Sequence, residues 1–201
     1  MTPEPEFRRP VHIGDSYETT PPWDIGRPQT DFAALAEQGE LRGRVLDIGC
    51  GTGEHALLAA RLGHEAVGID QSAHAIELAQ QKARERDLTA QFLCRDALAL
   101  ADLGETFDTV LDCGLFHTFD PELRAVYVES IAAVVRPGGR YFLLGCSDRQ
   151  PGTWGPYRLS RTDIETAFVK GWHIDSITET VIDILMDPPT LQAWLVSMTR
   201  T

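Results

Sequence analysis

The chain has 201 residues, 43% of them hydrophobic, which is enough for one domain with a core of its own. It carries 30 Asp and Glu residues against 18 Lys and Arg, and the resulting formal charge of −12 disfavours a nucleic-acid partner. The four cysteines match no zinc pattern, and no signal-peptide core or run of eighteen apolar residues is present, so we expect a cytoplasmic protein without a membrane partner.

The N-terminal segment is rich in proline, since residues 1–22 contain five of the 12 prolines. We therefore expect residues 1–28 to form an extended arm that can close over an active site. A helix follows, with Thr30 as its expected N-cap, because Phe32, Leu35 and Ala36 fall at helical spacing. Residues 29–201 are expected to form a single domain.

From residue 44 onward short apolar runs alternate with amphipathic stretches, which is typical of βαβ units. Two further strands without a helix between them close the chain and predict an antiparallel hairpin. The expected fold class is α/β, with a seven-stranded, mostly parallel sheet and helices on both faces. The expected strands are 44–48, 65–70, 89–94, 107–112, 139–145, 172–183 and 191–199, and the expected helices are 53–62, 72–86, 121–135 and one from Ser160.

A glycine loop follows the first strand of the alternating region. Gly49, Gly51 and Gly53 stand at alternate positions before a helix that begins near Glu54. Glycines allow the backbone to approach a ligand closely, and the amides at a helix start supply donors, so this loop is predicted to bind a cofactor. Asp47 stands in an otherwise apolar strand, which indicates a bond to the loop backbone or to a ligand amine.

The next strand ends in Asp70, at the spacing of an acid that accepts the hydroxyls of an adenosine ribose. A dinucleotide fingerprint has its third glycine three positions after the second, where this chain has Glu54. A carboxylate there would repel a pyrophosphate, whereas a cofactor with a sulfonium and an ammonium group tolerates acids nearby. The nicotinamide alternative is therefore disfavoured.

Five segments resemble, in order, the motifs of the class I S-adenosylmethionine-dependent methyltransferases, namely Val45–Gly53, Asp70, Arg95–Ala97, Phe107–Asp112 and Val135–Gly139. The resemblance implies the Rossmann-like fold of that class, S-adenosyl-L-methionine as cofactor and S-adenosyl-L-homocysteine as product. The predicted cofactor-binding residues are Trp23, Asp47, Gly49, Gly51, Gly53, Asp70, Gln71, Asp96, Ala97 and Cys113.

Three other segments narrow the resemblance to the thiopurine methyltransferase-like branch. They are 21–29, 114–117 and 148–155, and they look most like the heterocyclic toxin methyltransferases of mycobacteria. By this resemblance Trp23 would cover the cofactor, and an indole can indeed pack over a sulfonium through cation–π attraction.

The acceptor site is expected where the fourth strand ends, since doubly wound folds bind ligands at the carboxyl edge of the sheet. His117 lies there and is the predicted catalytic base, because the ordinary pKa of histidine suits proton exchange near neutrality. The alternative is that His117 only caps a loop or packs against the cofactor. Phe116, Trp154 and Tyr157 are predicted to line the pocket with His117, and no metal is expected.

The predicted function is methyl transfer to a hydroxyl or ring nitrogen of a small aromatic or heterocyclic acceptor, in a detoxifying role. Two alternatives remain open: a thiol or halide methyltransferase, and a cofactor-binding sensor without turnover. The expected partner is the small-molecule acceptor, and the protein is expected to be a monomer or homodimer.

Overall fold

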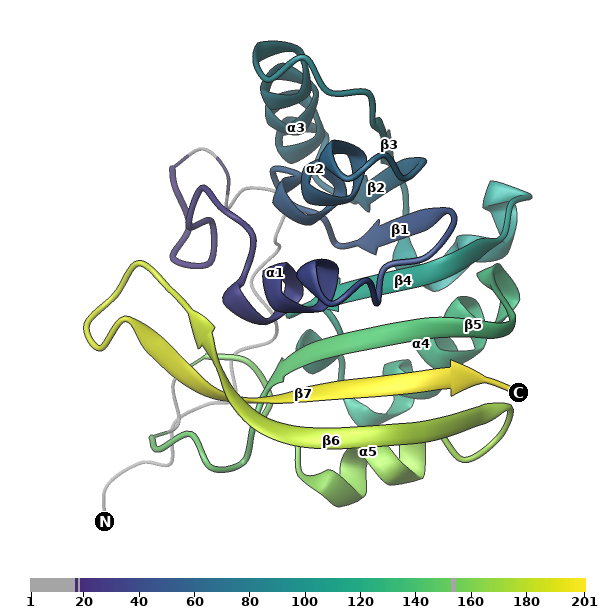
Figure 1. Ribbon diagram of the computed structural model, residues 1–201. Helices are drawn as coiled ribbons and strands as arrows, with labels where there is room; N and C mark the ends of the chain where they lie inside the picture. The colour runs from purple at the N-terminus through teal and green to yellow at the C-terminus, as the bar shows by residue number, and fades with distance from the viewer. Residues whose placement is uncertain (1–16, 18, 153–154) are drawn as a thin grey trace.

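The computed structural model describes residue 17, residues 19–152 and residues 155–201. Within them, seven strands form one mixed sheet in the order β3-β2-β1-β4-β5-β7-β6 (Figure 1). The first five strands are parallel, and β7 is antiparallel to both β5 and β6, which confirms the predicted sheet with its C-terminal hairpin. The strands are β1 Val45–Ile48, β2 Ala66–Asp70, β3 Gln91–Cys94, β4 Phe107–Cys113, β5 Val135–Cys146, β6 Trp172–Asp183 and β7 Thr190–Arg200.

Helices cover both faces of this sheet (Figure 1). One core cluster packs the first three helices against the sheet, and a second cluster packs α4 and α5 against the other face. In the described part of the chain, none of the helices combines the length and apolar character needed to cross a bilayer. The helices are α1 Thr30–Glu37, α2 Glu54–Arg61, α3 Ala73–Glu85, α4 Pro121–Val134 and α5 Arg161–Ala167, with short 3₁₀ helices η2 Ala97–Leu103 and η3 Phe116–Thr118.

Most boundaries of the predicted strands and helices differ from the observed ones by one or two residues, and two other differences have a structural reason. Strand β5 begins at Val135, earlier than expected, because Val135 pairs with Phe107 ahead of a register shift. Helix α1 has Gln29 as its N-cap, so Thr30 is already helical, and the Thr30 hydroxyl instead donates to Asp183 Oδ2 at 2.9 Å.

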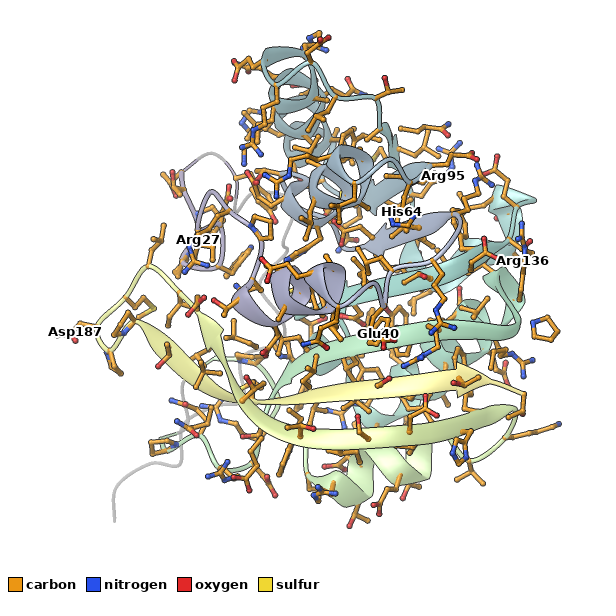
Figure 2. The ribbon with its side chains drawn as sticks, viewed as in Figure 1. Arg27, Glu40, His64, Arg95, Arg136 and Asp187 are labelled. Atoms are coloured by element: carbon orange, nitrogen blue, oxygen red, sulfur yellow. The ribbon has the colours of Figure 1, made fainter. Side chains whose placement is uncertain are left out.

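The described part of the arm, residues 17 and 19–28, contacts the β6–β7 hairpin near the carboxyl end of β1. The Leu185 amide donates to the Pro22 carbonyl at 2.7 Å, and the Arg27 guanidinium donates to Asp183 Oδ2 at 3.0 Å. Arg27 and Asp187 accordingly lie on the same side of the molecule, and Arg136 lies on the opposite side (Figure 2). Arm, hairpin tip and the carboxyl ends of the parallel strands therefore share one edge.

Candidate active site

The glycine loop between β1 and α2 turns through three left-handed residues. Gly49, Gly51 and Gly53 have φ angles of +65°, +51° and +87°, which side chains rarely adopt. At Gly53 a Cβ would lie 2.7 Å from Phe92 Cε1 and 2.9 Å from Ala79 Cβ. Gly53 therefore permits the close packing of α2 on its neighbours, and the loop is held in one shape.

Asp47 lies under this loop with one oxygen unused. Its Oδ2 accepts from the Ala56 amide at 3.1 Å, whereas the buried Oδ1 has no hydrogen-bond partner. The closest cationic candidate, His55 Nδ1, is 3.8 Å from Oδ1, which is too long for a hydrogen bond. A buried carboxylate oxygen without a donor can accept a hydrogen bond from a ligand ammonium group.

Asp70 ends β2 beside the same loop. Its Oδ2 accepts from the Gly51 amide at 2.9 Å and its Oδ1 accepts from the Ser72 amide at 2.8 Å. Burial raises the pKa of this carboxyl group, and the backbone amides oppose that shift. Each oxygen keeps a lone pair, so the carboxylate can still accept two ribose hydroxyls. Ser72 caps α3 through the Ala75 amide, so that capping role does not fall to Asp70.

The remaining predicted cofactor residues follow the ends of β2, β3 and β4. Asp96 is exposed and caps η2 by accepting from the Leu98 amide at 2.9 Å. The Ala97 carbonyl accepts from the Ser130 hydroxyl at 2.8 Å, and the Gln71 carbonyl accepts from Cys94 Sγ. Cys113 is the last residue of β4, where burial raises the pKa of its thiol. Adjacent parallel strands thus bring these positions to one edge.

The arm covers the glycine loop with a residue that the sequence analysis did not identify. Tyr17 is only 6% exposed, and a Cβ on Gly51 would lie 2.6 Å from its hydroxyl. Trp23, the predicted cover, is 48% exposed, and its indole N–H donates to the Tyr17 hydroxyl at 3.2 Å. Burial and the Asp70 charge raise the pKa of Tyr17, so the phenol stays neutral.

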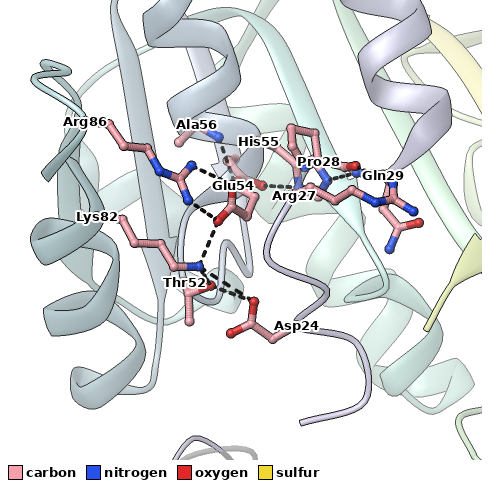
Figure 3. A network of polar contacts seen from close by, with 11 residues as sticks. Asp24, Arg27, Pro28, Gln29, Thr52, Glu54, His55, Ala56, Lys82 and Arg86 are labelled. Carbon is pink, nitrogen blue, oxygen red and sulfur yellow. Dashed lines mark hydrogen bonds and ion pairs between the residues drawn. The ribbon is translucent and has the colours of Figure 1, made fainter. Parts of the chain in front are cut away.

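An ion-pair network fixes the arm to the loop (Figure 3). The Thr52 hydroxyl donates to Asp24 Oδ1 at 2.9 Å, and Lys82 Nζ donates to Thr52 Oγ1 and to Glu54 Oε1. Arg86 donates through both terminal nitrogens to the Glu54 carboxylate at 2.8 Å. Lys82 and Arg86 thus pair with Glu54, so the charge of Glu54 alone does not distinguish a pyrophosphate cofactor from a cationic one.

His117 lies in η3, after β4, and is buried. Its Nδ1 accepts from the Cys146 amide at 2.8 Å, so the neutral ring carries its proton on Nε2, beside Gly114. Burial, with the nearby Arg158 and Arg124 charges, lowers the pKa of His117 to about 3. The imidazole is therefore uncharged at neutral pH and, before any acceptor binds, a weak base.

The other residues predicted to line the acceptor pocket differ in burial and in their contacts. Phe116 is fully buried in the core, with ring centroids 6.1 Å from Tyr127 and 5.5 Å from Phe168, which favours a supporting role beneath the loop. Tyr157 is half-buried, and its amide donates to the His117 carbonyl at 3.1 Å. Trp154 lies outside the described residues.

Among the residues that the structure describes, no three His, Cys, Asp or Glu side chains gather closely enough to hold a metal ion. Polar side chains described at this edge include the carboxylates of Asp47 and Asp70, the imidazole of His117 and the phenol of Tyr17.

The chain is similar to known methyltransferases in sequence. A family model described as a methyltransferase domain matches residues 45–139. The chain is 38% identical over 161 residues to the 2-heptyl-1-hydroxyquinolin-4(1H)-one methyltransferase of Mycobacteroides abscessus, covering 79% of this chain and 71% of that protein. It is 29% identical over 167 residues to probable thiol methyltransferase 2 of Arabidopsis thaliana, covering 81% and 74%.

Two solved structures are similar to this chain in fold. A structure from work on the conversion of a disulfide bond into a thioacetal group during echinomycin biosynthesis superposes with a TM-score of 0.84 and 37% identity, covering 96% of this chain and 91% of that one. The magnesium protoporphyrin IX methyltransferase of Synechocystis, with bound S-adenosylmethionine, shares the fold with a TM-score of 0.68 and 24% identity, covering 86% and 77%.

Proposed function

Because the chain belongs to the class I S-adenosylmethionine-dependent methyltransferases, we propose that it methylates a hydroxyl or ring nitrogen of a small aromatic heterocycle. The observation that carries the acceptor class is the 38% identity, over 79% of this chain, to an enzyme named for a hydroxyquinolinone. An alignment of 161 of the 201 residues is long enough to include both the cofactor loop and the loop after β4, where we place the acceptor.

The carboxyl edge supports specific roles in holding the cofactor. When bound, S-adenosylmethionine supplies a methyl group on a sulfonium, a carbon already activated for in-line displacement. Asp70 would accept the ribose hydroxyls, and Asp47 Oδ1 would accept from the ammonium group. Gly49, Gly51 and Gly53 would let the loop backbone approach the cofactor closely.

We include the other edge positions in the same proposal. Gln71, Asp96 and Ala97 would line the adenosine half, and Cys113 would lie below it at the end of β4. Tyr17, with Trp23 bonded to it, would exclude water above the loop, and excluding water strengthens the remaining electrostatic contacts.

His117 is the proposed catalytic residue, with Tyr157 beside it as an acceptor contact. In the tautomer that the Cys146 amide selects, Nε2–H can donate to an ionised acceptor oxygen and orient it for attack. The low pKa makes His117 a poor base for a neutral hydroxyl unless the bound acceptor raises that pKa. Orientation of an anionic nucleophile is therefore the role we favour.

A thiol acceptor is the second proposal, because the plant thiol methyltransferase covers as much of this chain as the quinolinone enzyme does. A thiolate is a strong nucleophile and needs alignment more than proton removal. Loss of activity on changing His117→Gln would then be smaller for a thiol than for a hydroxyl acceptor.

We further propose that the enzyme acts in the cytoplasm on toxic small molecules, as a monomer or homodimer, without nucleic acid or membrane as partner. The charge of −12 and four unpaired cysteine thiols support this setting.

The acceptor class is tested by incubating the full chain with S-adenosylmethionine and a panel of 1-hydroxyquinolin-4-ones, hydroxyquinolines, quinols, thiols and iodide. Release of S-adenosylhomocysteine and the mass of the methylated product are the readouts. Turnover of the flat hydroxylated heterocycles supports the proposal. Turnover confined to thiols or iodide refutes it and favours the second proposal.

A further inference from the structure

A fully buried carboxylate lies near the end of β4 and, among the described residues, makes no ion pair. Asp112 is 0% exposed, and its Oδ2 accepts from the hydroxyls of Tyr127 at 2.7 Å and Tyr141 at 2.8 Å. Its other acceptor contacts are the amides of Leu115 at 2.9 Å and Phe116 at 3.2–3.3 Å. Burying an ionised carboxylate is costly, and these neutral hydroxyl and amide donors offset part of that cost.

The two amides belong to the loop that joins cofactor and acceptor. The Leu115 side chain packs on the glycine loop, since a Cβ on Gly49 would lie 3.1 Å from Leu115 Cδ2. Phe116 begins η3, and the next residue is His117, whose ring is fixed by the Cys146 amide. Asp112 thus bonds the backbone of the segment that carries both Leu115 and His117.

Packing alone does not account for this group. Apolar residues of similar volume often stabilise a core as well as, or better than, buried charges do. The surrounding cluster is otherwise made of side chains such as Ile131, Val110 and Leu143. Asp112 Oδ2 accepts from both tyrosine hydroxyls and from the Phe116 amide, and Oδ1 accepts from the amides of Leu115 and Phe116. One buried carboxylate thus joins two core side chains to the loop backbone, and that arrangement points to a loop anchor.

We propose that Asp112, held by Tyr127 and Tyr141, is a positioning residue that fixes the loop after β4 so that Leu115 meets the cofactor loop and His117 meets the acceptor. The proposal rests on the acceptor site being at this edge, as argued above. In this proposal Asp112 acts through the amides of Leu115 and Phe116.

Titration of Asp112 gives the proposal a signature that a purely structural role lacks. Burial raises the pKa of Asp112 to about 6, and the tyrosine hydroxyls and loop amides oppose that rise. The described titratable groups whose pKa values respond to the Asp112 charge include Tyr127, Tyr141 and the Cys113 thiol. Burial raises the pKa of each of them, so they stay neutral near pH 6. His117, with its pKa of about 3, is also uncharged there.

The experiment compares the full chain with Tyr141→Phe, Tyr127→Phe and Asp112→Asn, with Ile164→Val in α5 as a control that truncates the core outside the network. Hydrogen exchange of the Leu115 and Phe116 amides is measured at one pH without acceptor. We expect faster exchange at these two amides in the three network variants, and unchanged exchange there in Ile164→Val. Unchanged protection in the network variants would overturn the proposal whatever the acceptor proves to be.

The second readout is the pH profile of kcat/KM on one turned-over acceptor. Each Tyr→Phe change removes a donor that favours the ionised carboxylate, so the acid limb should move upward by about one pH unit. Ile164→Val should lower the melting temperature without moving that limb. An acid limb of the kcat/KM profile that does not move in either tyrosine variant would contradict the proposal that Asp112 anchors the loop. If Asp112→Asn does not fold, the tyrosine variants alone decide.

Discussion

The close packing at Gly53 makes a quantitative prediction. Gly53→Ala places a methyl group 2.7–2.9 Å from Phe92 and Ala79 at a φ of +87°. The left-handed conformation should cost about 1–2 kcal/mol for a residue with a Cβ. The overlap should add about 1–3 kcal/mol, as overpacked cores do. The free energy of unfolding should therefore fall by roughly 2–5 kcal/mol.

Gly63→Ala is the matched control, because Gly63 has the same φ of +87° and nothing within 4 Å of its Cβ position. It should lose only the conformational part, about 1–2 kcal/mol. Thermal unfolding by circular dichroism would show melting temperatures lower by roughly 5–15 °C for Gly53→Ala and roughly 3–6 °C for Gly63→Ala. Equal losses in the two variants would show that α2 does not pack closely here, and would refute the reasoning about the third glycine.

Three further outcomes follow from the site. Asp70→Asn should weaken S-adenosylmethionine binding by about 10–100-fold in calorimetry, since hydrogen bonds to a charged group are lost; an unchanged affinity would remove Asp70 from the site. Asp183→Asn should release Arg27 and speed proteolysis of the arm several-fold, with Asp187→Asn as control, and equal cleavage rates in the two would contradict the tether. His117→Gln should flatten the pH dependence of stability. The pKa of His117 in the folded protein lies far below its ordinary value of 6.5, so its contribution to wild-type stability is retained above pH 6.5. The free energy of unfolding of the wild type should fall by about 2 kcal/mol between pH 7.5 and pH 5. A parallel fall in the variant would argue against a buried neutral ring.

The strands, the helices and the glycine loop could be predicted from the sequence, because the patterns that mark them are local in the chain. The alternation of apolar runs marked all seven strands, and Gly49, Gly51 and Gly53 marked the cofactor loop. The order of the elements placed Asp70 and His117 at one edge, since the ends of adjacent parallel strands meet there.

The side-chain partners could not be predicted, because they come from distant parts of the chain. Tyr141 lies 29 residues from Asp112, and Lys82 and Glu54 are 28 residues apart, with no periodicity linking either pair. Tyr17 carried a weak signal, an aromatic residue shortly before Trp23, yet only the fold shows which of the two is buried. The low pKa of His117 likewise depends on burial that no motif encodes.

The most direct test of the account is a calorimetric titration of the full chain with S-adenosylmethionine, followed by single-turnover transfer of its labelled methyl group to a 1-hydroxyquinolin-4-one. The account predicts one binding site, loss of affinity in Asp70→Asn, and a methylated product formed with one equivalent of S-adenosylhomocysteine. Absence of binding, or binding that Asp70→Asn leaves unchanged, would contradict a cofactor site at the carboxyl edge of β1 and β2.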